Sequence, residues 1–203
     1  MLSNKFFLLV SIVFLLFSFL MYSSCGEDDP EPTTIQLLLN LDMESGTNSP
    51  YYWGWFSVPP EAEDDFKHTW TDGEYYSPTK SLEISSDIPY DSTFSSWVQT
   101  VRNIPHNKDV KLTVKIKGIN LEGEGVSIAI RADDTTIPSL LQFETTQDRI
   151  EIKGTFDWTT YSIEMENILD DVNLIYIFLL YHPNTTGTVY FDDATLTYAY
   201  ESQ

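Results

Sequence analysis

The residues with the clearest chemical potential are two adjacent carboxylates, Asp192 and Asp193, in an apolar, β-branched and aromatic run near the C-terminus. Buried carboxylates are unfavourable unless they are hydrogen-bonded, paired with a cation or bound to a metal ion. Asp42 and Glu44 follow another apolar run, near the start of the domain. We therefore expect the first and last strands to meet and to share a structural calcium ion, bound by Asp42, Glu44, Asp192 and Asp193. The alternative is that a carboxylate of the closing strand accepts hydrogen bonds from the backbone amides of a loop.

Aromatic residues provide a second set of candidate binding groups. Trp53 and Trp55 lie in a dense aromatic segment, and Trp97 and Gln99 share one face of the expected strand 94–101. An aromatic ring can stack on the apolar face of a sugar ring, and an amide can make paired hydrogen bonds to its hydroxyl groups. These four residues are therefore candidates for glycan binding. The alternative is that they belong to the core, and at least one of the tryptophans at 53 and 55 is expected to be buried.

Two further candidates, Arg131 and Tyr176, depend on which face of a strand lines a groove. Arg131 ends an expected strand, where its guanidinium could donate in-plane hydrogen bonds to a sugar. The alternative is a surface arginine paired with Asp133 or Asp134. Tyr176 and Tyr181 lie on opposite faces of an apolar strand, so one of them could reach a ligand.

The elements that must position these residues are β-strands. The chain has twelve Tyr, twelve Phe and five Trp, and short apolar runs alternate with clusters of Pro, Gly, Asn and Asp, which is typical of an all-β protein. Segment 110–117 alternates most regularly between apolar and polar residues, and the turn at 122–125 is expected to return it as a hairpin with 126–131. The expected strands are 35–41, 82–85, 94–101, 110–117, 126–131, 140–143, 149–153, 161–165, 174–182 and 187–198.

The N-terminal segment has the features of a lipoprotein leader. A positive charge precedes the apolar run 6–21, and small residues follow it before Cys25, the only cysteine in the chain. Ser23, Ser24 and Cys25 resemble the lipobox of bacterial lipoproteins, which implies that Cys25 is acylated once the signal peptide, residues 1–24, is removed. The alternative is an uncleaved N-terminal anchor, because an apolar run of about this length could just span a bilayer.

Residues 25–34 are acidic, contain prolines and are expected to form an extended tether before the domain 35–203. This tether resembles the acidic tag that some Gram-negative bacteria with surface glycan-uptake systems place after the lipidated cysteine. The resemblance implies an extracytoplasmic protein that is lipid-anchored to the outer membrane and exposed at the cell surface. Other surface glycan-uptake proteins would then be within its reach.

The charge of the chain limits its partners. The formal net charge is −20 at pH 7, which repels the phosphate backbone of nucleic acids and disfavours anionic polysaccharides unless calcium bridges them. A neutral glycan fits this surface best. A simpler interpretation is that the charge keeps an extracellular protein soluble.

The order of several short motifs resembles the carbohydrate-binding modules of families 4, 9 and 22, which are galactose-binding-like jelly rolls. The matching segments are Asn-Leu-Asp-Met-Glu at 40–44, Gly-Trp at 54–55, Ser-Leu-Glu-Ile at 81–84, Trp-Val-Gln at 97–99, Trp-Thr-Thr-Tyr at 158–161 and Val-Tyr-Phe-Asp-Asp-Ala-Thr-Leu at 189–196. The resemblance implies an antiparallel β-sandwich with a ligand groove on its concave sheet, and often a calcium site where the chain ends meet. It assigns Glu44 and either Asp192 or Asp193 to calcium, and Trp97 and Gln99 to the binding strand.

The common catalytic motifs do not occur in the sequence. There is no HExxH or GxSxG motif, the three histidines have no metal-ligand spacing, and the single cysteine is expected to be acylated. Surplus carboxylates are usually solvated surface groups. The sequence therefore predicts a protein that is not an enzyme and binds a neutral oligo- or polysaccharide as a membrane-anchored surface lipoprotein. The alternative is an adhesion or assembly module of the same fold, with a protein partner and no glycan affinity.

Overall fold

The computed structural model describes residues 33–200; the expected signal peptide, Cys25 and most of the tether lie outside these residues. The described chain is largely β-strand, with one short 3-10 helix, η1 (Pro60–Asp65). No helix in this part of the chain is both long and apolar enough to cross a membrane. The strands are β1 (Thr33–Gln36), β2 (Gly54–Val58), β3 (Lys67–Thr71), β4 (Ser81–Ser86), β5 (Phe94–Val101), β6 (Val110–Glu122), β7 (Val126–Asp134), β8 (Ser139–Thr145), β9 (Gly154–Met165), β10 (Leu174–Tyr181) and β11 (Thr186–Tyr200).

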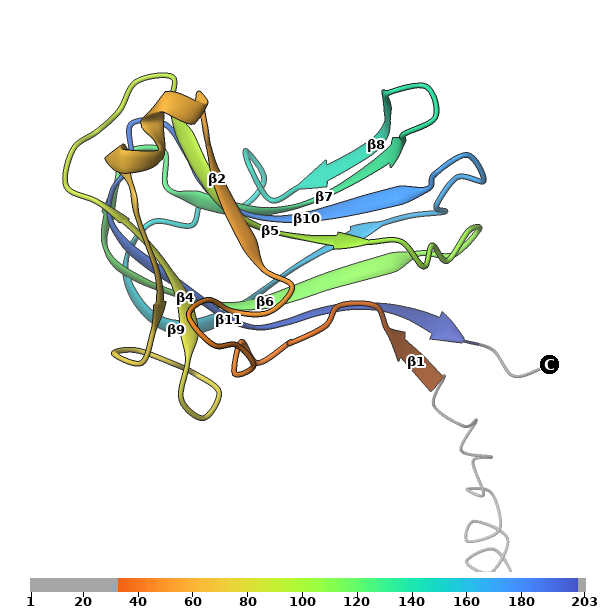
Figure 1. Ribbon diagram of the computed structural model, residues 1–203, viewed down its shortest axis with the longest axis horizontal. Helices are drawn as coiled ribbons and strands as arrows, with labels where there is room; N and C mark the ends of the chain where they lie inside the picture. Colours follow the sequence, from red (N-terminus) through yellow and green to blue (C-terminus); the bar gives the residue numbers. More distant parts are fainter. Residues whose placement is uncertain (1–32, 201–203) are drawn as a thin grey trace, which may run out of the picture. The chain divides into compact units, whose positions relative to one another are not determined.

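These strands form two sheets that face each other (Figure 1). A six-stranded sheet has the order β3-β4-β11-β6-β9, with β1 also paired to β11, and a five-stranded sheet has the order β2-β5-β10-β7-β8. Every paired strand runs antiparallel to its neighbour. The predicted fold class, an all-β antiparallel sandwich of the jelly-roll type, is confirmed.

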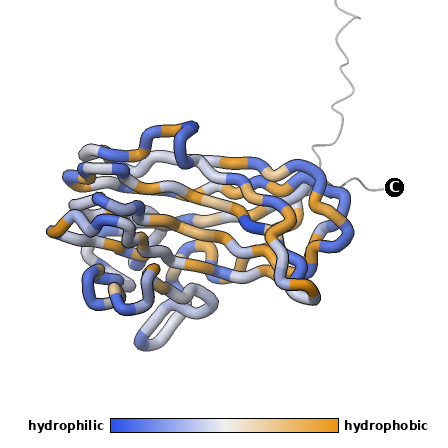
Figure 2. The backbone as a smooth tube through the Cα atoms, turned by 90° about the horizontal axis from the view of Figure 1, so that it is seen from above, coloured by the Kyte–Doolittle hydropathy of each residue, from blue (hydrophilic) through white to orange (hydrophobic). Residues whose placement is uncertain are grey.

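The core lies between the two sheets because side chains alternate from one face of a strand to the other. On β6, Leu112, Val114 and Ile116 are fully buried, whereas the residues between them are at least partly exposed. Apolar and polar positions alternate in the same way along several strands in Figure 2. The prediction for segment 110–117 is therefore confirmed, and the strand continues to Glu122.

The first and last strands meet, as the sequence predicts. Thr33 lies opposite Tyr200, and the pairing continues to Gln36 opposite Thr197. The strand is shorter than the predicted segment 35–41, because the Gln36 side-chain oxygen accepts hydrogen bonds from the next two backbone amides and from the amide of Leu196. The chain nevertheless continues beside β11.

The turn after β6 does not form the expected hairpin. β6 lies in the six-stranded sheet and β7 in the five-stranded sheet, so the two strands are not paired with each other. Gly123 and Gly125 connect the sheets with φ angles of 83° and 81°, a conformation that side chains rarely tolerate. A Cβ atom on Gly123 would lie 1.9 Å from the backbone oxygen of Asn184. The glycines therefore mark a crossing between the layers and not a hairpin turn.

Candidate functional site

The five-stranded sheet is the upper layer in Figure 1. Its outer face carries a row of partly exposed apolar and aromatic side chains. On β10, Ile175, Ile177 and Leu179 are fully buried in the core. The residues between them therefore lie on the other face, where Tyr176 and Phe178 are only partly buried. This alternation answers the question that the apolar sequence of β10 leaves open: Tyr176 faces outward and Tyr181 is in the core.

One end of this face is polar. Tyr176 on β10 lies directly opposite Arg131 on β7, and the guanidinium carbon of Arg131 is 6.0 Å from the centre of the tyrosine ring. The Arg131 Nε donates to both carboxylate oxygens of Asp133, at 2.9 and 3.0 Å. This hydrogen-bonded pairing raises the pKa of Arg131, which stays charged.

The pairing with Asp133 uses only one of the three guanidinium nitrogens of Arg131. The Arg131 side chain is 42% exposed, and within residues 33–200 its hydrogen bonds to other side chains use Nε. Its two terminal nitrogens can therefore donate to a ligand in the plane of the group. Arg131 is thus paired with Asp133, as the alternative interpretation expects, and it also lies on the outer face, where a ligand could reach it.

The other end of the face is apolar. The ring of Phe178 stacks on Tyr176 with 5.8 Å between the ring centres. Phe56 of β2 meets Phe178 edge-on at 6.0 Å and Phe94 of β5 at 6.1 Å. Offset and edge-on arrangements at these distances are favourable aromatic contacts, so the rings form a continuous floor across three strands.

Two adjacent hollows lie over this floor. The smaller, of about 290 Å³, is lined by Tyr176, Arg131 and Asp133 together with three apolar side chains. The larger, of about 540 Å³, lies beside it. Both are lined by Phe56, Arg131 and Phe178, so one ligand can occupy the two hollows at once.

The structure places Trp97 and Gln99 in the interior and not on the ligand face. Trp97 is 2% exposed, and its indole N–H donates to the backbone oxygen of Glu83 in the opposite sheet at 3.1 Å. Gln99 exchanges two hydrogen bonds with the backbone of Leu39, at 2.8 and 3.0 Å. The two residues do share a face, as predicted, but this face packs on the other sheet. Their predicted contact with a glycan is not supported.

Trp53 and Trp55 are also absent from the outer face. Trp53 is buried, and its indole N–H donates to the backbone oxygen of Asn40. Trp55 is 43% exposed, but it lies on the inward parity of β2, opposite Trp97. Its ring stacks on His68 of β3 at 4.3 Å and covers the edge of the sandwich. Trp53 thus has the core position that the alternative interpretation expects for at least one of the pair.

The carboxylate of Asp192 is surrounded by hydrogen-bond donors. It accepts from the backbone amides of Tyr76 and Ser77, both at 2.8 Å, from the Ser77 hydroxyl at 2.7 Å and from the amide of Asp193 at 2.6 Å. Burial raises the pKa of Asp192, and these hydrogen bonds act in the opposite direction. This is the alternative expected from the sequence: a carboxylate of the closing strand that holds a loop.

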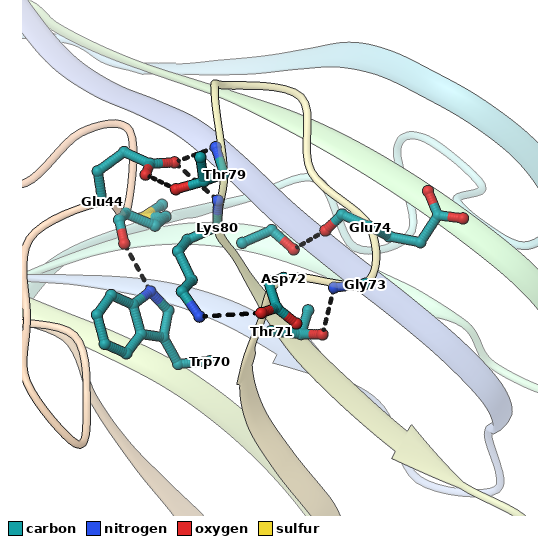
Figure 3. Close-up of polar contacts among 10 residues, drawn as sticks. Glu44, Trp70, Thr71, Asp72, Gly73, Glu74, Thr79 and Lys80 are labelled. Carbon is teal, nitrogen blue, oxygen red and sulfur yellow. Dashed lines mark hydrogen bonds and ion pairs between the residues drawn. The ribbon is translucent and has the colours of Figure 1, made fainter.

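Glu44 holds the same loop at a second point (Figure 3). Its carboxylate accepts from the backbone amides of Thr79 and Lys80, at 2.8 and 2.7 Å, and from the Thr79 hydroxyl. Burial raises the pKa of Glu44, but these hydrogen bonds outweigh it and the pKa is lowered. The loop between β3 and β4 is therefore fastened to both ends of the domain.

The donors around Asp192 and Glu44 occupy the carboxylate oxygens that the calcium prediction relies on, and the calcium site itself stays a prediction. Calcium needs six to eight oxygen ligands, whereas amide and hydroxyl hydrogens point at the carboxylates of Asp192 and Glu44. Asp42 accepts a 3.3 Å hydrogen bond from the Glu44 amide at an exposed position. Within residues 33–200, no three Asp, Glu, His or Cys side chains are grouped so that they could hold a metal ion. Asp193, the fourth predicted ligand, belongs to no such group.

Sequence reasoning missed the phenylalanines and Asp133 as parts of the site. The alternation of side chains along a strand is the signal that could have found the phenylalanines. Phe178 lies two residues from Tyr176 on β10 and so shares its face, and Phe56 lies next to Trp55 on the opposite face of β2. Once one tryptophan is known to be in the core, its strand neighbours must lie on the outer face. The sequence alone does not show which of the two faces is covered.

Comparisons with known proteins support the fold. No protein-family model matches the chain, and no curated protein matches it at a significant level. Among solved structures, the carbohydrate-binding module TmCBM61 in complex with β-1,4-galactotriose has a TM-score of 0.52 at 17% identity, over 80% of this chain and 97% of that one. A Clostridium thermocellum xylanase 10B fragment, with modules CBM22-1 and GH10 and bound xylohexaose, has a TM-score of 0.51 at 14% identity. This match covers 83% of this chain and 29% of the xylanase fragment.

The same fold occurs in proteins of other kinds. The Stig cyclase Fisc from Fischerella sp. TAU has a TM-score of 0.58 at 16% identity, over 84% of this chain and all of that one. The chain also matches a domain of tailspike protein 4 from bacteriophage CBA120, but spans about a fifth (21%) of its length. At such identities the likeness shows the fold alone, so function has to be argued from the site.

Proposed function

We propose that this protein binds a neutral oligo- or polysaccharide on the outer face of its five-stranded sheet and catalyses no reaction on it. The observation that carries the proposal is the group of Tyr176, Arg131 and Asp133, which lie on neighbouring strands around one hollow. The tyrosine ring can stack on a sugar, the guanidinium can donate to its hydroxyl groups, and the carboxylate can accept from them. All three belong to paired strands, which keep them in place without a ligand.

The charge of the site suits a neutral sugar. Arg131 and Asp133 form a close ion pair, so the group has little net charge to offer a polyanion. The formal charge of the whole chain, −20, also repels polyanions. TmCBM61, in complex with β-1,4-galactotriose, has this fold, and so does part of a xylanase fragment that is complexed with xylohexaose. This supports a glycan over the protein partner of an adhesion or assembly module.

The proposal includes a lipid anchor. Acylation of Cys25 would hold the domain at the outer membrane by the tether 25–34, facing the outside of the cell and close to other surface glycan-uptake proteins. Cys25→Ala should move the protein from the membrane fraction to the soluble fraction and abolish incorporation of labelled fatty acid. Unchanged membrane association of this variant would show that the apolar N-terminal run itself is the anchor.

The test of binding is isothermal titration against soluble neutral β-glucans, xylans, mannans and galactans. We expect one class to bind saturably, and Tyr176→Ala to weaken that binding by about tenfold or more, since one stacked ring contributes on the order of 1.4 kcal/mol. Tyr75→Ala is the matched control, because Tyr75 is 45% exposed in the loop between β3 and β4. Equal loss in both variants, or no binding by any glycan, would contradict the proposal.

A further inference from the structure

The two hollows on the outer face differ in chemistry along β10. Tyr176, Phe178 and Leu180 lie opposite Arg131, Ala129 and Ser127 of β7 in turn. The charged partner, Arg131, is at the first of these positions. Beyond it, small β7 residues leave the rings of β10, β2 and β5 as the dominant surface.

The larger hollow is mainly apolar. Its polar lining residues include Arg131, which it shares with the smaller hollow, and His182, which is buried and within 2.7 Å of the Ser127 hydroxyl. Glu124 and Gln147 also border it. Its apolar lining consists of Phe56, Val58, Phe94, Phe143, Phe178, Leu180 and Pro183.

A bare sugar ring is a poor match for this hollow. A pyranose carries hydroxyl groups around its edge, and each of them would lose water without gaining a partner against phenylalanine and aliphatic side chains. Tyrosine and tryptophan have a polar group at the ring edge that can bond such hydroxyls, and phenylalanine does not. An aromatic or acyl group would instead bury apolar surface on both sides.

The spacing of the two hollows matches one substituted sugar. Tyr176 and Leu180 are four residues apart on one strand, which is about 14 Å at the usual rise per residue. A sugar residue on Tyr176 can therefore carry a substituent that passes over Phe178 and reaches Leu180. The shared lining at Phe56 and Phe178 makes the path continuous.

We propose that the ligand is a neutral glycan that bears an apolar substituent, an aromatic or acyl group, and that this substituent occupies the larger hollow. This inference rests on the proposed glycan binding at Tyr176 and Arg131. It adds the class of glycan that the site selects. The sugar is held at the polar end of the face and the substituent at the apolar end.

The test compares pairs of ligands that share a sugar and differ in the substituent. Phenyl and methyl β-glycosides of glucose, xylose, mannose and galactose disaccharides are titrated into the purified protein. For the sugar that binds, we expect the phenyl glycoside to bind about tenfold more tightly than the methyl glycoside. Equal affinities of the pair, with binding still lost in Tyr176→Ala, would overturn this inference and leave the glycan-binding function in place.

Phe94→Ala assigns the gain to the larger hollow. Phe94 is partly buried on β5, at the apolar end of the face, and lines the larger hollow but not the smaller one. We expect this variant to keep the affinity for the methyl glycoside and to lose several-fold of the phenyl preference, whereas Leu169→Ala, at an exposed loop position, keeps both. An unchanged phenyl preference in Phe94→Ala would place the substituent elsewhere and contradict the inference. If no glycoside or polysaccharide binds, the proposed function fails and this inference fails with it.

Discussion

Glu44 and Asp192 each accept three hydrogen bonds from the loop between β3 and β4, and of the two carboxylates Asp192 is the buried one. Its two oxygens accept four hydrogen bonds inside the protein. In Asp192→Asn, one oxygen becomes an amide group that faces donors, so two of them lose their acceptor. We expect the variant to lose about 2–4 kcal/mol of unfolding free energy, measured by chemical denaturation.

The neighbouring residue supplies the control for that variant. Asp193 has a φ of 45°, which asparagine tolerates well, and it is only partly buried. Asp193→Asn should therefore change the unfolding free energy by less than about 1 kcal/mol. Equal stability of the two variants would contradict the role given to Asp192.

His68 should make stability depend on pH. Burial lowers its pKa from 6.5 to about 4, so the unfolded chain binds this proton more readily than the folded one. The neutral histidine thus contributes stability that is present above pH 6.5 and is lost as the pH falls towards 4. Denaturation at pH 7.5 and 5 should show a smaller loss for His68→Gln than for the wild type. Parallel losses would show that other groups carry the pH dependence.

In strand β5, one face packs in the core and the other face lines the proposed binding site. Trp97 points to the opposite sheet, and Val98 points to the outer face. We expect Trp97→Ala to cost about 3–5 kcal/mol of unfolding free energy, as is usual for a buried large ring, and Val98→Ala to cost about 1 kcal/mol or less. A Trp97→Ala protein as stable as the wild type would contradict the core position.

The same strand shows what the sequence can predict. Period-two alternation correctly places Trp97 and Gln99 on one face, and the regular pattern of β6 fixes its inward side. Neither pattern shows that Leu39, sixty residues away, covers Gln99, or that Glu83 of the other sheet covers Trp97. Which face is core depends on such long-range contacts. Of the predicted ligand-binding residues, Arg131 and Tyr176 lie on the outer face, whereas Trp53, Trp97 and Gln99 are buried and Trp55 lies on the inward parity of β2.

For the whole molecule, the meeting of the chain ends does not require a metal ion in this arrangement. The hydrogen bonds of Asp192 and Glu44 to the loop 72–80 already hold the ends together. We expect thermal melts in calcium and in chelator to agree within about 1 °C, because a ligand stabilises only by binding the folded state. A rise of several degrees with calcium that Glu44→Gln abolishes would restore the calcium site expected from the sequence.

The outer face of the five-stranded sheet is the proposed binding face of the molecule, and this location of binding is the central claim. NMR titration of the isotope-labelled protein with the glycan that binds best tests it most directly. We predict saturable shifts in the amides of 94–100, 127–133 and 174–180, which form the floor of the two hollows. Shifts concentrated in the six-stranded sheet, around Tyr76 and Trp158, would contradict the claim, because those residues lie next to each other in the other part of the fold.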